Sequence, residues 1–153
     1  MGKKKPEQTI QMGVFSNLIT LMHLQKYSQF MAFQIRNETG VGGEKGAMIG
    51  AFAKAMGTME GVSDTVFLFP EWRKQGTLLV DVMRPKIVFV EFKALKPLKT
   101  KELIPDTLLS RAQEKFRDRV ATLGFEYRII AATDVNHALE QIYELLRANG
   151  VRV

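Results

Sequence analysis

The pattern of apolar and polar positions divides the chain into alternating helical and extended segments. Apolar residues recur every three or four positions in several stretches, which predicts helices over residues 6–26, 47–56, 109–123 and 134–149. Short β-branched and aromatic runs predict strands over residues 30–35, 64–69, 86–93 and 127–132, with a further extended segment over 77–82. The resulting order, α-β-α-β-β-α-β-α, predicts an α/β sandwich with a mixed sheet of about four strands.

The segment 86–93 gives the clearest strand pattern. Ile87 and Phe89 fall on one face, and Val88, Val90 and Phe92 fall on the other. A strand that is apolar on both faces is typical of the centre of a covered sheet. We therefore expect this strand to lie inside the sheet, with helices on both sides.

The composition narrows the possible chemistry. The chain has 153 residues, of which 46% are hydrophobic and 25% charged, as in a single soluble domain over 1–153, with 1–5 as a flexible basic tail. The absence of cysteine excludes disulfides, thiolate zinc sites and a cysteine nucleophile, and two histidines exclude a histidine-rich metal site. No apolar run reaches the length of a membrane span, so we expect a cytoplasmic protein.

The net charge of +6 is concentrated in one part of the chain. Residues 84–101 contain six basic residues and one acidic residue, a local charge of +5. A concentrated basic segment is typical of proteins that bind polyanions such as nucleic acids. A solvated loop with a basic tail would show the same charge, so charge alone does not establish nucleic-acid binding.

A glycine-rich segment, 37–46, suggests a nucleotide loop but lacks the required spacing. In a phosphate-binding P-loop a lysine and then a hydroxyl residue follow the last glycine, whereas here Lys45 precedes Gly46 and Ala47 follows it. The dinucleotide pattern fails as well, because Val41 stands where its first glycine belongs. A surface loop is the better interpretation, and closure over a larger ligand stays open.

Two carboxylates are candidates for a metal site. Glu91 and Lys93 share a face of their strand, and two charges at the end of an apolar strand must pair, bind an ion or meet solvent. Asp64 begins the preceding strand after a turn-forming glycine, so the two carboxylates converge if the strands are neighbours. Oxygen ligands without histidine or cysteine favour Mg²⁺ or Mn²⁺. A simple Glu–Lys pair is the structural alternative.

Gln113 and Glu7 complete the set of candidate residues. Ser110 and Gln113 have the spacing of a capping box at a helix start, which explains Gln113 without any catalytic role. Glu7 lies in the first turn of the first helix, on its inward side. A favourable interaction with the helix dipole is an equally good explanation for it.

In this order, these residues resemble the VRR-NUC domain of the PD-(D/E)xK nuclease superfamily. The resemblance runs from about Glu7 to Leu146 and rests on Glu7, Gly61-Val62-Ser63-Asp64, Glu91-Phe92-Lys93 and Ser110–Gln113, with Asn37 ahead of the glycine-rich loop. The family usually has proline at the positions of Ser63 and Arg111. The segments 71–85 and 94–109 are longer than in compact members.

The resemblance implies a restriction-endonuclease-like fold and cleavage of phosphodiester bonds. Asp64, Glu91 and the carbonyl oxygen of Phe92 would hold Mg²⁺ or Mn²⁺, and Lys93 would position or deprotonate the attacking water. Gln113 would orient the water or Lys93, and Glu7 would assist. Residues expected to contact DNA are Asn37, Arg73, Lys74, Lys96, Lys99 and Lys101, although a solvated turn is the better interpretation of 72–74.

Short stand-alone phage and bacterial members resemble Holliday-junction resolvases that act as homodimers. The first hypothesis is therefore a metal-dependent, structure-specific endodeoxyribonuclease for branched DNA. The alternatives are a nucleic-acid-binding module without catalysis, and a less selective nuclease or nickase for duplex DNA. The complete set of Asp64, Glu91 and Lys93 argues against a pure binding module.

Overall fold

A computed structural model describes residues 6–24, 30–35, 62–70, 72–73, 82–83, 85–95 and 108–153. The glycine-rich loop, the helix expected over 47–56 and residues 77–81 lie outside the described residues. Residues 1–5, the basic tail of the sequence analysis, lie outside them too. No helix of the described parts is long and apolar enough to cross a membrane.

Three helices match the sequence pattern closely: α1 (Pro6–Leu24), α3 (Arg111–Thr122) and α4 (Val135–Ala148). The Asp134 side chain caps α4 by accepting a hydrogen bond from the His137 backbone N–H at 3.0 Å. Gly124 and Gly150 follow α3 and α4 with φ of 81° and 79°. Left-handed backbone of this kind favours glycine and ends a helix, as the sequence predicted.

The main sheet has four strands in the order β1-β2-β5-β6. Their bounds are β1 (Met31–Gln34), β2 (Thr65–Phe69), β5 (Lys86–Ala94) and β6 (Glu126–Ala132). β1, β2 and β5 pair antiparallel, whereas β5 and β6 pair parallel. The predicted α/β class with a mixed four-stranded sheet is therefore confirmed, and β5 lies inside the sheet as expected.

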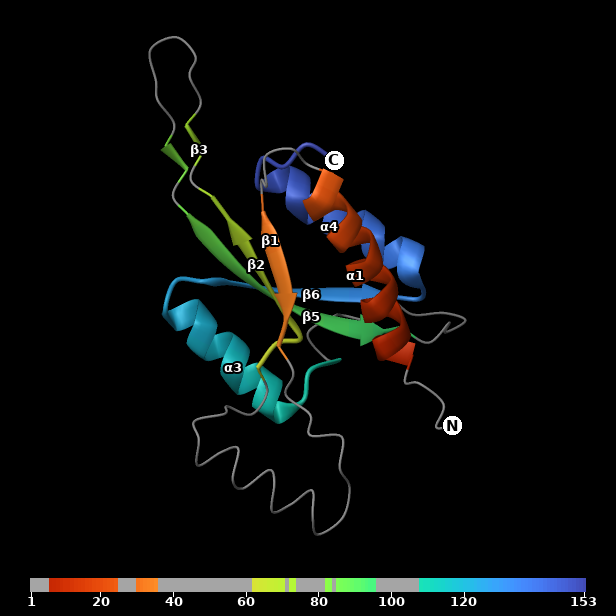
Figure 1. The fold of residues 1–153 in the computed structure, drawn as a ribbon. Coiled ribbons are helices and arrows are strands. Elements are labelled where there is room, and N and C mark those ends of the chain that lie inside the picture. Colours follow the sequence, from red (N-terminus) through yellow and green to blue (C-terminus); the bar gives the residue numbers. More distant parts are fainter. Residues whose placement is uncertain are drawn as a thin grey trace.

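A second, two-stranded sheet joins β3 (Trp72–Arg73) to β4 (Val82–Met83). The interpretation of 72–73 as part of a solvated turn is wrong, because Trp72 pairs with Met83 and Arg73 pairs with Val82. Figure 1 shows these strands extending away from the main sheet beyond β2 and β5. Residues 72–73 are too few to show an alternating pattern, so the sequence does not predict this strand without its pairing to β4.

The helices cover opposite faces of the main sheet, with α1 and α4 on one face and α3 on the other (Figure 1). The face toward α1 and α4 carries Val88, Val90 and Phe92 of β5, each at most 1% exposed. These residues pack with the inward stripe of α1, Ile10, Val14 and Leu18.

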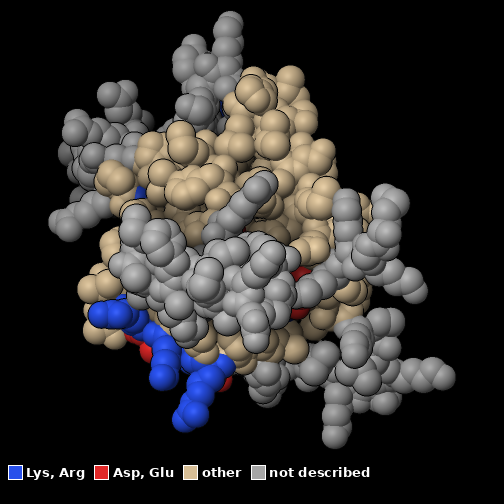
Figure 2. Space-filling model, turned by 60° about the horizontal axis from the view of Figure 1, so that its bottom comes forward, with Lys and Arg blue, Asp and Glu red and all other residues tan. Residues whose placement is uncertain are grey.

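Helix α3 packs on the other face through aromatic contacts. The ring of Phe116 lies edge-on to Phe89 of β5, with 5.4 Å between ring centroids, and edge-on to Tyr127 of β6 at 6.1 Å. These contacts fix α3 across β5 and β6. Along its solvent side, Lys and Arg side chains stand in a row (Figure 2).

Candidate active site

Asp64 and Glu91 lie opposite one another where β2 begins and β5 approaches its end. Thr65 pairs with Val90 in the antiparallel register of these strands, so the preceding residue of β2 stands across from the following residue of β5. The Oδ2 atom of Asp64 accepts a hydrogen bond from the backbone N–H of Phe92 at 3.1 Å. The fold thus brings the two candidate carboxylates to one place from positions 27 residues apart.

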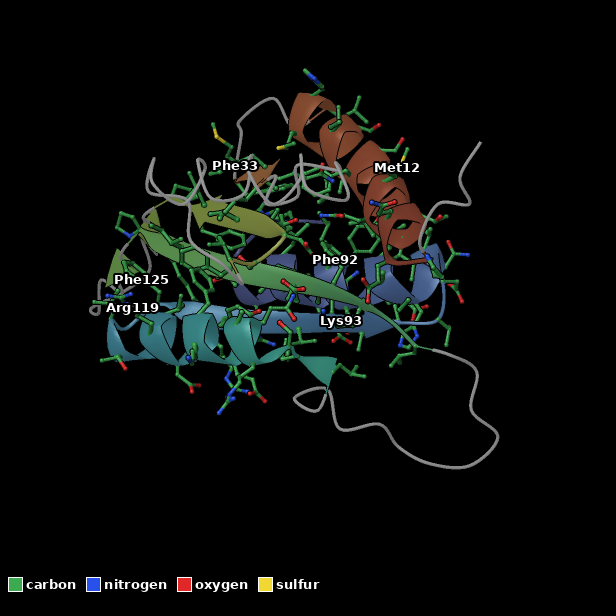
Figure 3. All side chains as sticks on the ribbon, turned by 90° about the horizontal axis from the view of Figure 1, so that it is seen from below. Met12, Phe33, Phe92, Lys93, Arg119 and Phe125 are labelled. Atoms are coloured by element: carbon green, nitrogen blue, oxygen red, sulfur yellow. The ribbon has the colours of Figure 1, made fainter. Side chains whose placement is uncertain are left out.

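The Glu91 carboxylate is held by a small network of side chains on the α3 side of β5. Glu91 is 2% exposed, and its Oε1 atom lies 3.0 Å from the Lys93 Nζ atom. The same oxygen accepts a hydrogen bond from Gln113 Nε2, while Lys93 Nζ donates to Gln113 Oε1 at 3.1 Å. Figure 3 shows Lys93 on the α3 side of β5 and Phe92 on the opposite side.

Gln113 forms the predicted helix cap and also contacts Glu91 and Lys93. Its Oε1 atom accepts a hydrogen bond from the Ser110 backbone N–H at 2.9 Å, and the Ser110 hydroxyl accepts one from the Gln113 backbone N–H at 3.3 Å. This reciprocal pair is the predicted capping box. Because the cap fixes the Gln113 side chain, the start of α3 also fixes the contacts of Gln113 with Glu91 and Lys93.

Burial changes the acidity of Glu91. Removal from water, together with a smaller effect of the negative charge of Asp64, raises the pKa of the Glu91 carboxyl from 4.5 to about 7. The charge of Lys93 and its hydrogen bond act in the opposite direction. The ion pair with Lys93 therefore does not compensate for burial and for the second carboxylate.

One oxygen of Glu91 and the hydroxyl of Tyr127 are buried without a hydrogen-bond partner in the described part of the chain. Tyr127 lies on β6 beside Phe89. Burial raises the pKa of the Tyr127 hydroxyl, and the charges of Glu91 and Asp64 raise it further. Sequence reasoning did not select Tyr127. Tyr127 lies on the same sheet face as Glu91, and this relation becomes apparent only once the β5–β6 register is known.

The two carboxylates are suitable ligands for a divalent cation, although they are only two. Among the described residues, no group of three His, Cys, Asp or Glu side chains converges. Mg²⁺, however, commonly uses only one or two carboxylates and completes its coordination with waters and substrate phosphates. The unpartnered Glu91 Oε2 atom and the repulsion between Glu91 and Asp64 are both features that a cation would relieve.

The remaining predicted site residues are less well placed or not described. Glu7 lies in the first turn of α1, half-buried, and among the described residues no hydrogen bond or ion pair joins it to the Glu91 network. The Arg73 backbone belongs to β3, but its side chain is not described. The other predicted DNA contacts lie outside the described residues: Asn37, Lys74, Lys96, Lys99 and Lys101.

A surface hollow of about 330 Å³ lies at the other end of β5. It is lined by Pro85, Lys86, Ile87, Gly124, Phe125 and Glu126, and Lys86 forms an ion pair with Glu126 there. The hollow is open and its charges are already paired, so the candidate chemistry is at the Glu91 end. Comparison with protein-family models, curated proteins and solved structures finds no match to this chain.

Proposed function

We propose that this protein is a metal-dependent, structure-specific endodeoxyribonuclease that hydrolyses phosphodiester bonds in branched DNA, in the manner of a Holliday-junction resolvase. The proposal includes a restriction-endonuclease-like arrangement of the observed α/β sandwich. One observation carries it: Asp64, Glu91, Lys93 and Gln113 come from three elements and meet at one end of β5. The Glu91 carboxylate there keeps one oxygen without a partner among the described residues.

Each residue of the site has a physical role in this proposal. Asp64, Glu91 and the Phe92 carbonyl would hold Mg²⁺ or Mn²⁺, which supplies positive charge for the phosphodiester and activates water. Lys93 would position that water or accept its proton. Gln113, held by the helix cap, would keep Lys93 in place.

The lysines at 96, 99 and 101 would contact backbone phosphates independently of sequence. Asn37, Arg73 and Lys74 would add further DNA contacts. Glu7 would assist from the start of α1, which lies beside the C-terminal end of β5 in Figures 1 and 3.

We also propose that the chain acts as a homodimer, since two active sites related by a two-fold axis can cut two opposed strands. The outer surface of α1 supports this proposal. Met12 and Ile19 are about half exposed, at 52% and 48%, and residues 8–24 contain no Asp, Glu, Lys or Arg. A helix surface that faces water usually carries charged residues. An uncharged surface on α1 would allow two copies of a basic chain to meet there without charge repulsion.

The test is cleavage of a labelled four-way junction and a matched linear duplex in Mg²⁺, Mn²⁺ or EDTA. Asp64→Asn and Glu91→Gln should abolish cutting and preserve or strengthen DNA binding, because each removes negative charge near the phosphate. Glu140→Gln, an exposed position of α4, is the matched control and should cut normally.

Three results would count against the proposal. No cleavage of either DNA in any metal would reject the nuclease and leave the binding module. Equal cleavage of both DNAs would favour the less selective duplex nuclease. Normal cutting by either carboxylate variant would show that the metal site is wrongly assigned.

A further inference from the structure

The solvent side of α3 carries a basic stripe formed by Arg111, Lys115 and Arg119. All three residues are exposed and follow one another at intervals of four, so they lie along one side of the helix. Successive members are about 6 Å apart along the helix axis. Figure 2 shows a row of Lys and Arg side chains with Asp or Glu atoms beside it at the lower left of the view, and Figure 3 places Arg119 at the end of α3 far from Lys93.

The basic stripe differs from most of the other described basic residues because its members form no ion pair with a described carboxylate. Within the described part of the chain, Lys86, Lys93, Arg117 and Arg128 each form an ion pair with a carboxylate. Arg111, Lys115 and Arg119 form none there, although Glu114 and Asp118 are on the same helix. Three neighbouring cations are therefore available to an external anion.

The spacing of the basic stripe is unfavourable for the helix itself. Like charges at i and i+4 repel one another, which applies to Arg111 with Lys115 and to Lys115 with Arg119. Arg111 also occupies the first turn of α3, where the helix dipole favours an acidic residue. Glu114 and Asp118, at i+3 from Arg111 and Lys115, and the place of Arg119 in the last turn offset part of this repulsion. The feature that indicates binding is that the three exposed cations form no ion pair with a carboxylate in the described part of the chain.

We propose that the basic stripe binds the phosphate backbone of one DNA strand and leads that strand to the candidate active site. The position of the start of α3 carries the inference, because Gln113 in the first turn contacts Glu91 and Lys93 and the stripe begins at Arg111 in the same turn. Arg111 and Gln113 point to different sides of the helix, so the strand would pass around the start of α3 to reach the site. A row of cations at regular spacing is complementary to the regular phosphates of a nucleic-acid strand. The DNA partner rests on the proposed nuclease function.

The test measures binding of a labelled four-way junction by fluorescence anisotropy over a series of salt concentrations, in EDTA so that cutting does not interfere. The triple variant R111Q/K115Q/R119Q should bind at least tenfold more weakly. Its plot of log affinity against log salt should be shallower by about three, because each lost phosphate contact removes nearly one unit of slope. Arg147→Gln, an exposed position of α4 on the opposite face of the sheet, should bind as wild type.

The possible outcomes distinguish a wrong assignment of the basic stripe from a wrong assignment of the nuclease function. The triple variant loses like-charge repulsion but also the favourable charge of Arg119 in the last turn, so its thermal unfolding temperature should stay close to that of wild type. Weaker binding at an unchanged unfolding temperature then reflects lost contacts. If wild type binds and cuts the junction while the triple variant has unchanged affinity and salt slope, the stripe is wrongly assigned and the nuclease stands. If the triple variant loses only binding to phosphatidylserine vesicles, the partner is a membrane surface and our inference is wrong.

Discussion

Glu91 should make the metal-free protein less stable as the pH rises toward neutrality. The folded protein holds the proton of this carboxyl up to about pH 7, whereas the unfolded chain releases it near the ordinary value of 4.5. Between these values the folded state binds more protons than the unfolded state, so the free energy of unfolding falls with rising pH. Below about pH 4.5 both states are protonated and the loss disappears.

The size of the effect follows from the difference between the two pKa values. Each unit corresponds to about 1.4 kcal/mol, so the shift of Glu91 amounts to about 3 kcal/mol at full ionisation. Little of this is screened by solvent, because the side chain is 2% exposed. Glu91→Gln keeps the shape and removes the titration, so relative to wild type it should gain about 3 kcal/mol between acidic and alkaline pH.

The assay is urea unfolding in EDTA, followed by far-UV circular dichroism, at a series of pH values from about 4.5 to 8. The difference between wild type and Glu91→Gln reports on this carboxyl and its coupling to Asp64 and Lys93, and cancels the titrating groups that do not interact with it. Parallel stability curves over the whole range would refute the reasoning. If the site binds Mg²⁺, adding the ion at alkaline pH should restore the stability of wild type and leave the variant unchanged.

Two further predictions concern packing and assembly. Gly13→Ala should lower the free energy of unfolding in urea by about 1–3 kcal/mol, because a Cβ atom there would lie 2.6 Å from a methyl carbon of Val135. Adding Val135→Ala should recover the loss. A single variant more stable than wild type would contradict the close contact. Ile19→Lys and Met12→Glu should each convert the proposed dimer to a monomer, measured by light scattering, while the circular dichroism spectrum stays unchanged. If both variants remain dimeric, this face of α1 is not the dimer interface.

The sequence was sufficient for most of the fold because its strongest signals are local. The alternation over 86–93 predicted both faces of β5, with Val88, Val90 and Phe92 toward one helix layer and Phe89 toward the other. The Ser110 cap and the glycine stops at 124 and 150 located the helix ends within a few residues. Each of these features depends on neighbours in the chain, which is why pattern alone is enough.

Features that depend on register or on separate elements were not predictable in the same way. Tyr127 meets the acidic site only through the β5–β6 pairing, and Gly13 meets Val135 only through the crossing of α1 and α4. The basic stripe of α3 was missed for a different reason. Its members occur at every fourth position between other residues, two of them acidic, so the local charge of α3 is lower than that of the segment 84–101.

The Glu91–Lys93 contact alone does not decide between a structural ion pair and a catalytic site, since both interpretations require it. A structural pair should leave both charges stabilised. Here the pKa of Glu91 stays raised despite the pair, one carboxylate oxygen has no partner in the described region, and a second carboxylate, Asp64, lies beside it. A domain that only binds phosphates has no need of a negative charge at position 91, and a neutral residue there would repel phosphate less, at the cost of the ion pair of Lys93. The retention of two mutually repelling carboxylates therefore favours a site that requires their negative charge, as a metal-dependent nuclease does.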